Sequence, residues 1–123
     1  MMKFIKPATI ALLLGLSPLT TVAHSDVKAL YGGQVQVSHD LEFELVHGAE
    51  LLTLYVRDHG EPLPSINLNA RISVLSGGKK TDDTMTSDGA NALLANIAIT
   101  EKAVVIVQLE QNGHHAVTVR FSL

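Results

Sequence analysis

The chain contains no cysteine and no tryptophan, and only five of its 123 residues are aromatic, three phenylalanines and two tyrosines. Without cysteine the protein has no disulfide, no thiolate metal site and no thiol redox chemistry. With so few aromatic rings, a stacking surface for sugars or nucleobases is not expected. Basic side chains are outnumbered by acidic ones, nine against twelve. No nucleic acid is therefore expected as a partner, because its binding draws on clustered lysine and arginine.

Long apolar runs are also lacking, and the clearest one is the short stretch Ala8–Leu16 near the start. Its nine residues are far below the roughly 20 that cross a bilayer. Two lysines precede the run, and Thr21-Val22-Ala23 provides small residues for a signal peptidase. We therefore predict a signal peptide over residues 1–23 and a periplasmic protein with no membrane insertion after processing. An extracellular destination is the alternative.

Cleavage after Ala23 leaves residues 24–123, which is enough chain for one compact domain and too little for two independent cores. The mature part keeps seven basic side chains against twelve acidic ones, a net charge of −5 with neutral histidines. We predict a single domain.

Alternation of apolar and polar residues is the main pattern of the mature sequence, and it predicts strands rather than helices. In the clearest case Leu68, Ala70 and Ile72 alternate with Asn69 and Arg71, so one face is apolar. The sequence predicts eight strands, over residues 33–37, 41–46, 51–57, 68–75, 79–86, 91–97, 103–109 and 117–123.

Turn residues separate these strands. Asn112-Gly113, Gly77-Gly78 and Asp88-Gly89 mark reversals, and the prolines of residues 60–64 cannot continue a central strand. Strands with one apolar face must bury that face against each other, so we predict an all-β, immunoglobulin-like antiparallel β-sandwich of seven to eight strands, with a small β-barrel as the alternative. The predicted core contains Phe43, Leu45, Leu54, Val56, Ile72, Val74, Val105, Val107, Val119 and Phe121.

Five segments of the chain carry a family resemblance: LYGGQV at 30–35, EFELV at 42–46, LYVRDHGEP at 54–62, SGGKK at 76–80 and VTVRFSL at 117–123. With these segments the chain resembles a family of small exported bacterial proteins, whose related domains lie at the amino-terminal side of periplasmic adaptor subunits of heavy-metal efflux pumps. The resemblance implies metal capture by a histidine-rich leader that ends in His-Gly-Gly, and here Tyr31 precedes Gly32-Gly33.

Six histidines lie in the mature part. Successive antiparallel strands reverse direction, so every second connection falls at the same end of a sandwich. By this count the connections that hold His39, His59 and the pair His114-His115 share one end, and His47 lies at the other. Three aspartates are expected beside the grouped histidines: Asp40, Asp58 and Asp88.

The processed amino terminus adds a further ligand, because the α-amine and imidazole of His24 together form a chelate. Imidazoles and carboxylates bind copper(II), zinc and nickel, which are the candidate metals; no other cofactor is expected. The predicted metal ligands are His24, His39, His59, His114 and His115.

Catalysis is not predicted. Ser38-His39-Asp40 and Asp58-His59 place acids beside histidines, but no nucleophile motif accompanies them, and they are interpreted as turns. The protein is expected not to be an enzyme, with no catalytic and no cofactor-binding residues.

Two hypotheses follow. The first is a periplasmic metal-binding or metal-delivery accessory protein linked to heavy-metal efflux or resistance, which the grouped histidines favour. The second is a non-catalytic immunoglobulin-like interaction module, which Tyr31 in place of histidine favours. The expected partner is a periplasmic efflux adaptor or another envelope protein.

Overall fold

The computed structural model describes residues 27–111 and 115–123. The predicted signal peptide, His24, His114 and the predicted turn at Asn112-Gly113 lie outside these described residues. Within the described ranges no helix has the length and apolar character that crossing a membrane requires.

Ten strands and one 3-10 turn make up the described chain. In chain order they are β1 (Gln34–Ser38), β2 (Leu41–His47), β3 (Leu52–Asp58), β4 (Glu61–Pro62), the 3-10 turn (Ser65–Asn67), β5 (Leu68–Ser76), β6 (Lys79–Thr84), β7 (Thr86–Ser87), β8 (Ala92–Ala95), β9 (Ala103–Gln111) and β10 (Val117–Ser122).

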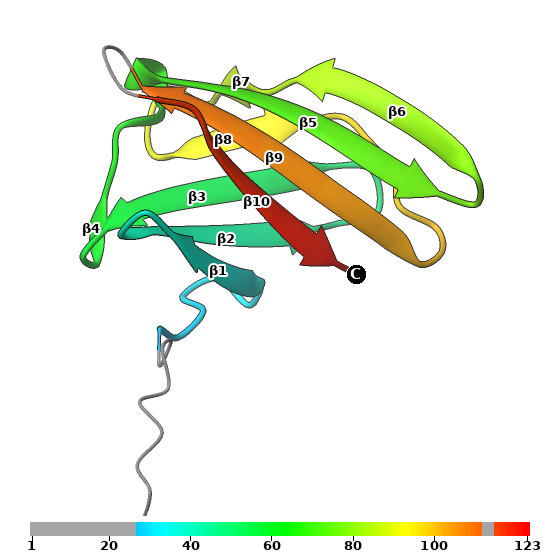
Figure 1. Cartoon of the computed structure of the whole chain (residues 1–123), viewed down its shortest axis with the longest axis horizontal. Coiled ribbons are helices and arrows are strands. Elements are labelled where there is room, and N and C mark those ends of the chain that lie inside the picture. The colour runs from blue at the N-terminus through cyan, green and yellow to red at the C-terminus, as the bar shows by residue number, and fades with distance from the viewer. Residues whose placement is uncertain (1–26, 112–114) are drawn as a thin grey trace, which may run out of the picture.

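The strands form two antiparallel sheets that pack face to face, as Figure 1 shows. The first sheet has the order β1-β2-β3-β8-β7, with β4 paired to β3, and the second has the order β10-β9-β5-β6. The runs β2-β3-β8-β7 and β10-β9-β5 repeat the A-B-E-D and G-F-C orders of an immunoglobulin domain, with β1 added at one edge. Neither sheet closes on itself, so the predicted sandwich is confirmed and the barrel alternative is not adopted.

All eight predicted strands are present, with ends that differ by at most two residues. The prediction for residues 79–86 was wrong in one respect, because the chain changes sheets there. Buried Met85 separates β6 in the second sheet from β7 in the first, and its N–H donates to the Ala70 carbonyl at 2.8 Å. The two-residue strands β4 and β7 carry too few residues for alternation to reveal them.

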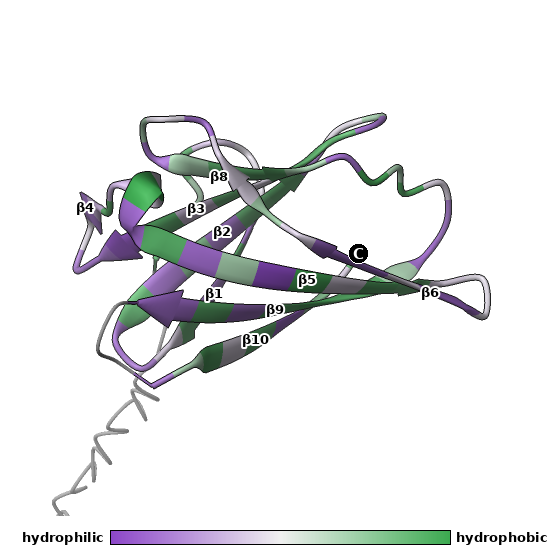
Figure 2. Ribbon diagram, turned by 90° about the horizontal axis from the view of Figure 1, so that it is seen from above, coloured by the Kyte–Doolittle hydropathy of each residue, from purple (hydrophilic) through white to green (hydrophobic). Residues whose placement is uncertain are grey.

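The core lies between the sheets, where the apolar faces of the strands meet. Figure 2 shows the alternation along β5, whose hydrophobic positions Leu68, Ala70, Ile72 and Val74 are buried. All ten predicted core residues are buried, and Phe43 and Phe121 are completely covered. By contrast, the edge strand β6 is exposed along its whole length and carries four charged side chains, which disfavours pairing with another sheet.

We expect Phe121→Ala to destabilise the domain by about 3–5 kcal/mol, because it leaves a large cavity in the core. Ile66→Ala is the matched control, since Ile66 is 74% exposed, and it should change the free energy of unfolding by less than about 0.5 kcal/mol. Urea unfolding monitored by circular dichroism measures both. Equal effects of the two substitutions would contradict the assigned core.

Candidate functional site

Two tight turns stand next to each other at one end of the first sheet. His39-Asp40 joins β1 to β2, and Ser38 is paired to Leu41 across the turn. The two central residues, His39 and Asp40, have positive φ angles of 52° and 65°. His59-Gly60 joins β3 to β4 in the same way, with φ of 51° and 84°. Positive φ at both central positions defines a type I′ turn. The turns are neighbours because β2 and β3 are paired.

These turns and the start of β10 enclose an open cleft of about 400 Å³. The cleft brings together three predicted metal ligands, His39, His59 and His115, with Asp40 and Asp58. The remaining lining residues are Leu41, Gln111, Ala116 and Val117. We call this the histidine cleft. Its position agrees with the count of strand reversals in the sequence.

Two other sequence expectations concern the surroundings of the histidine cleft. His47 lies at the opposite end of β2, beside Gly33 and Gln34, as expected. Asp88 was expected near the grouped histidines, and it does not line their cleft. Its carboxylate instead accepts the N–H groups of Ala90 at 2.7 Å and Ala92 at 3.1 Å, so it shapes the turn between β7 and β8.

The histidine cleft also concentrates backbone strain. Among the described residues, the non-glycine positions with positive φ are His39, Asp40 and His59, and all three line the cleft. Residues other than glycine in this conformation cost about 1–3 kcal/mol each, and such residues cluster at functional sites. Gly77-Gly78, by comparison, forms the β5–β6 turn without this cost, with φ of 58° and 75°.

Each of the two turn histidines has one ring nitrogen engaged locally. His59 Nδ1 lies 2.6 Å from Asp58 Oδ1, and His39 Nδ1 lies 3.0 Å from Ser38 Oγ. The Nε2 atom of each ring is the one left for another ligand. A carboxylate on the second ring nitrogen is the usual arrangement of a metal-binding histidine, because it fixes the orientation of the ring.

The donors in the cleft fit a divalent transition metal by chemistry, since imidazole nitrogen and carboxylate oxygen are its common ligands. Within residues 27–111 and 115–123, however, no three such side chains are close enough together to hold a metal ion. The side chains of His59 and Asp58 are 79% and 50% exposed, so the surrounding residues leave room for them to move together. A complete site would need such movement or a further donor.

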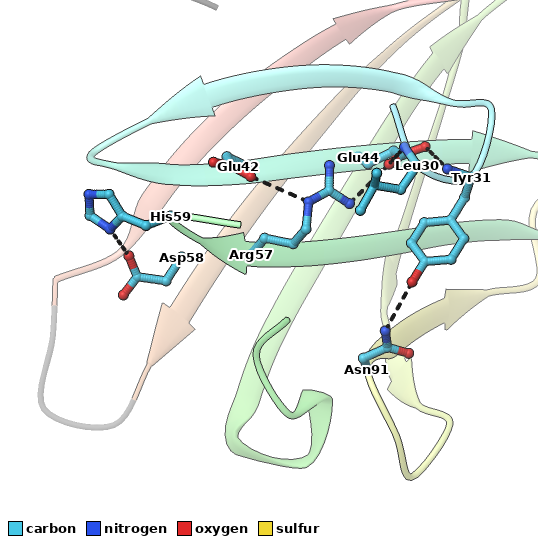
Figure 3. Close-up of polar contacts among 8 residues, drawn as sticks. All are labelled: Leu30, Tyr31, Glu42, Glu44, Arg57, Asp58, His59 and Asn91. Carbon is cyan, nitrogen blue, oxygen red and sulfur yellow. Dashed lines mark hydrogen bonds and ion pairs between the residues drawn. The ribbon is translucent and has the colours of Figure 1, made fainter. Parts of the chain in front are cut away.

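A second polar cluster lies on the outer face of the first sheet, where Glu44 is fully buried (Figure 3). Its Oε1 accepts the N–H of Leu30 at 2.8 Å, and its Oε2 accepts those of Tyr31 at 2.8 Å and Gly33 at 2.9 Å. The Arg57 guanidinium donates to Oε1 at 3.0 Å. The Glu44 carboxylate thus accepts four hydrogen bonds, and the three from backbone N–H groups hold residues 30–33 against β2. We call this cluster the Glu44 clamp.

Arg57 completes the clamp from the neighbouring strand β3. Its side chain is 2% exposed, and its Nε also donates to Glu42 at 3.3 Å. Figure 3 shows the guanidinium lying between the two glutamates. Burial by itself would raise the pKa of Glu44, but the N–H groups of Gly33, Leu30 and Tyr31 and the Arg57 guanidinium together hold the pKa below its ordinary value of 4.5.

The Tyr31-Gly32-Gly33 motif supplies two of the three backbone N–H groups that donate to Glu44. Gly32 has a φ of 77°, and a Cβ at Gly33 would collide with the Leu45 carbonyl oxygen. The Tyr31 ring stacks on that of Tyr55, with centroids 3.8 Å apart. Sequence reasoning missed the clamp, although Glu42 directly opposite Arg57 in the β2–β3 register was a signal for it.

Comparison with known proteins supports the fold class. No protein-family model matches the chain, and no curated protein matches it at a significant level. Among solved structures, the chain is similar to a DUF4426 family protein from Pseudomonas aeruginosa PAO1, with 19% sequence identity and a TM-score of 0.54. The match covers 73% of this chain and 94% of that one. At this identity the likeness concerns the fold alone.

We expect Glu44→Gln to destabilise the protein by about 3–5 kcal/mol at neutral pH, because it removes the closer of the two charged partners of the buried Arg57 guanidinium. The effect should depend on pH. Since the pKa of Glu44 is lower in the folded protein, its contribution is fully present above about 4.5 and is lost as pH falls through the folded pKa. Urea unfolding of both proteins across this range measures the difference.

Glu50→Gln is the control, because Glu50 is exposed, and it should leave stability nearly unchanged at every pH. A constant difference between wild type and Glu44→Gln from pH 7 to pH 3 would contradict the role of the charged carboxylate.

Proposed function

We propose that this protein is an exported, non-catalytic metal-binding or metal-delivery accessory protein of the periplasm, linked to heavy-metal efflux or resistance. One observation carries the proposal: the three strained non-glycine residues of the described chain, His39, Asp40 and His59, line one cleft together with Asp58 and His115. Turns of this type are normally built from glycine or asparagine. Histidine at these positions therefore lowers stability and places an imidazole in the cleft.

The chemistry of the cleft suits exchange of a metal rather than permanent storage. His39 and His59 each offer Nε2, and Asp58 orients the His59 ring. Nitrogen donors of this kind favour copper(II), zinc or nickel. The ligands stand on exposed hairpin turns, where a partner is able to approach and accept the ion. This accessibility is the property that delivery to an efflux adaptor would require.

A second candidate function, an interaction module, is favoured by the edge strand β1. Its sequence, QVQVS, contains no charged residue, and Val37 is 45% exposed. The edge strand β6 of the other sheet carries four charges. An uncharged edge accepts an additional strand more readily than a charged one. The occupant in this proposal is an extended segment of another envelope protein, added to β1 in the manner of β-augmentation.

The metal-binding proposal predicts opposite effects on stability and binding. Replacing His39 and His59 together by asparagine should raise the free energy of unfolding, by about 0.5–2 kcal/mol, because asparagine suits these turns. The same substitution should weaken copper(II), zinc or nickel binding, because the two imidazoles are removed. Calorimetric titration and urea unfolding of the processed protein measure the two effects.

His47→Asn is the matched control, because His47 lies exposed at the other end of β2. It should leave metal binding unchanged. Undiminished affinity for all three metals in the His39→Asn/His59→Asn protein, or no affinity in the wild type, would overturn the proposed metal function.

The interaction-module proposal predicts that Val37→Lys abolishes capture of a peptide segment on β1 while leaving metal binding intact, because it places a charge on the edge. Hydrogen exchange of the β1 amides, with and without an efflux-adaptor protein, is the measurement. Thr81→Lys on the charged strand β6 is the control. No added protection of β1 in the wild type would reject this second function.

A further inference from the structure

The strand β9 in the middle of the second sheet is apolar on both of its faces. Val105 and Val107 point into the core and are fully buried, while Val104 and Ile106 point outward and are half-buried. Strands of this kind are typical of sheets that are covered on both sides. Every described strand belongs to one of the two sheets, so none lies over the outer side of β9, and Figure 2 shows β5, β9 and β10 in front of the first sheet.

Leu75 extends this apolar surface from β9 onto the neighbouring strand β5. It pairs with Val104 in the β5–β9 register, so the two side chains lie next to each other on the same face. Leu75 is 41% exposed. The remaining outward positions of β5, β9 and β10 hold polar or charged residues. We call Leu75, Val104 and Ile106 the outer strip.

Two exposed arginines lie on either side of Ile106 on this face. Arg120 on β10 pairs with Ile106, and Arg71 on β5 pairs with Gln108, two residues farther along β9. Arg71, Ile106 and Gln108 line an open cleft of about 320 Å³. Among the described residues, neither arginine has a carboxylate within ion-pairing distance. Both guanidinium groups are therefore available to carboxylates of a partner.

The acidic residues of this face do not neutralise the arginines. Asp82 accepts the Ser73 hydroxyl at 2.5 Å and pairs with Lys80 at 3.7 Å, and Glu110 lies near the end of β9. The outward positions of the four strands hold three basic side chains against two acidic ones, whereas the whole chain has a net charge of −3. The face therefore attracts acidic partners more than the rest of the surface does.

We propose that the outer strip and its two arginines bind an extended segment of a partner protein that carries an apolar side chain between two carboxylates. From the strand spacing of about 4.8 Å and the rise of about 3.4 Å per residue, the Cα atoms of Arg71 and Arg120 lie about 12 Å apart. In an extended segment, residues i, i+2 and i+4 point to one side, and i and i+4 are about 13 Å apart. Acidic residues at i and i+4 thus match the arginines, and an apolar residue at i+2 matches Ile106.

This surface differs from both surfaces of the proposed functions. The histidine cleft lies at one end of the first sheet, and β1 is an edge of that sheet, whereas the outer strip lies on the second sheet. The inference therefore goes beyond both functions and does not depend on a bound metal. A protein with both surfaces is able to hold an ion and an acidic partner at the same time.

The test is a nuclear magnetic resonance titration of the isotope-labelled, processed protein. The probe is a capped peptide of the sequence Thr-Glu-Thr-Ile-Thr-Glu-Thr. We expect amide shifts concentrated in β5, β9 and β10. The affinity should fall as the ionic strength rises from about 0.05 M to about 0.5 M, because salt screens exposed charge pairs. No shifts in these three strands would overturn the proposal.

Substitutions on the face test each part of the match. Arg71→Gln and Arg120→Gln should each lower the affinity for the peptide about threefold to fivefold, since exposed ion pairs contribute modestly. Lys28→Gln is the matched control, because it removes the same charge from an exposed position outside the second sheet, and it should change nothing. Ile106→Thr keeps the branched side chain and should also weaken binding, whereas Val37→Thr on β1 should not.

A second peptide, with glutamine in place of both glutamates, distinguishes charge pairing from general loss of binding. It should bind the wild type and the two arginine variants with the same low affinity, because the carboxylates are absent. Equal affinity of the wild type for both peptides would overturn the pairing with the arginines. Self-association of the wild type without peptide, abolished by Arg120→Gln, would assign the face to a second copy and overturn the proposed partner.

Discussion

The buried carboxylate of Glu44 is the interaction on which the outer face of the first sheet depends. Glu44 occupies a position of β2 that points away from the sandwich core, where a glutamate would normally be solvated. It is covered because three backbone N–H groups of residues 30–33 converge on it. The segment in turn has no other regular structure. Carboxylate and segment therefore order each other.

A clamp of this kind specifies position more than it adds stability. Burying Glu44 and Arg57 removes two charges from water, a cost that their mutual attraction only partly repays. One guanidinium nitrogen, Nη2, is buried without a hydrogen-bond partner among the described residues, which adds to the cost. What the clamp provides is a fixed position, because the two carboxylate oxygens of Glu44 hold residues 30–33 in one path over β2.

The strands and core could be predicted from the sequence because alternation is a local signal. Residues such as Ile72 and Val107 show their burial through their spacing alone, and the structure buries both. The burial of Glu44 follows from residues 30–33, which are 11 to 14 positions away and have no periodic pattern. The switch of sheets at Met85 is likewise invisible locally, since residues on both sides of it form strands.

The histidine cleft could be predicted in part for a topological reason. Antiparallel strands alternate their ends, so counting reversals places His39 and His59 together and His47 apart. The type I′ conformation of their turns was not predicted, because histidine is not the residue that marks such turns, whereas Gly77-Gly78 could be recognised. Asp88 lies toward the same end of the first sheet, because the β7–β8 turn precedes Ala92, the partner of Tyr55, but its carboxylate is engaged by two backbone N–H groups of that turn.

The clamp and the histidine cleft share one strand, β3. Arg57 completes the clamp and is followed directly by Asp58 and His59, which line the cleft. A ligand that binds only when residues 27–33 are ordered must favour that order, and the ordered segment must favour the ligand by the same factor. The clamp defines the path of the segment through geometry, because three backbone N–H groups must meet one carboxylate.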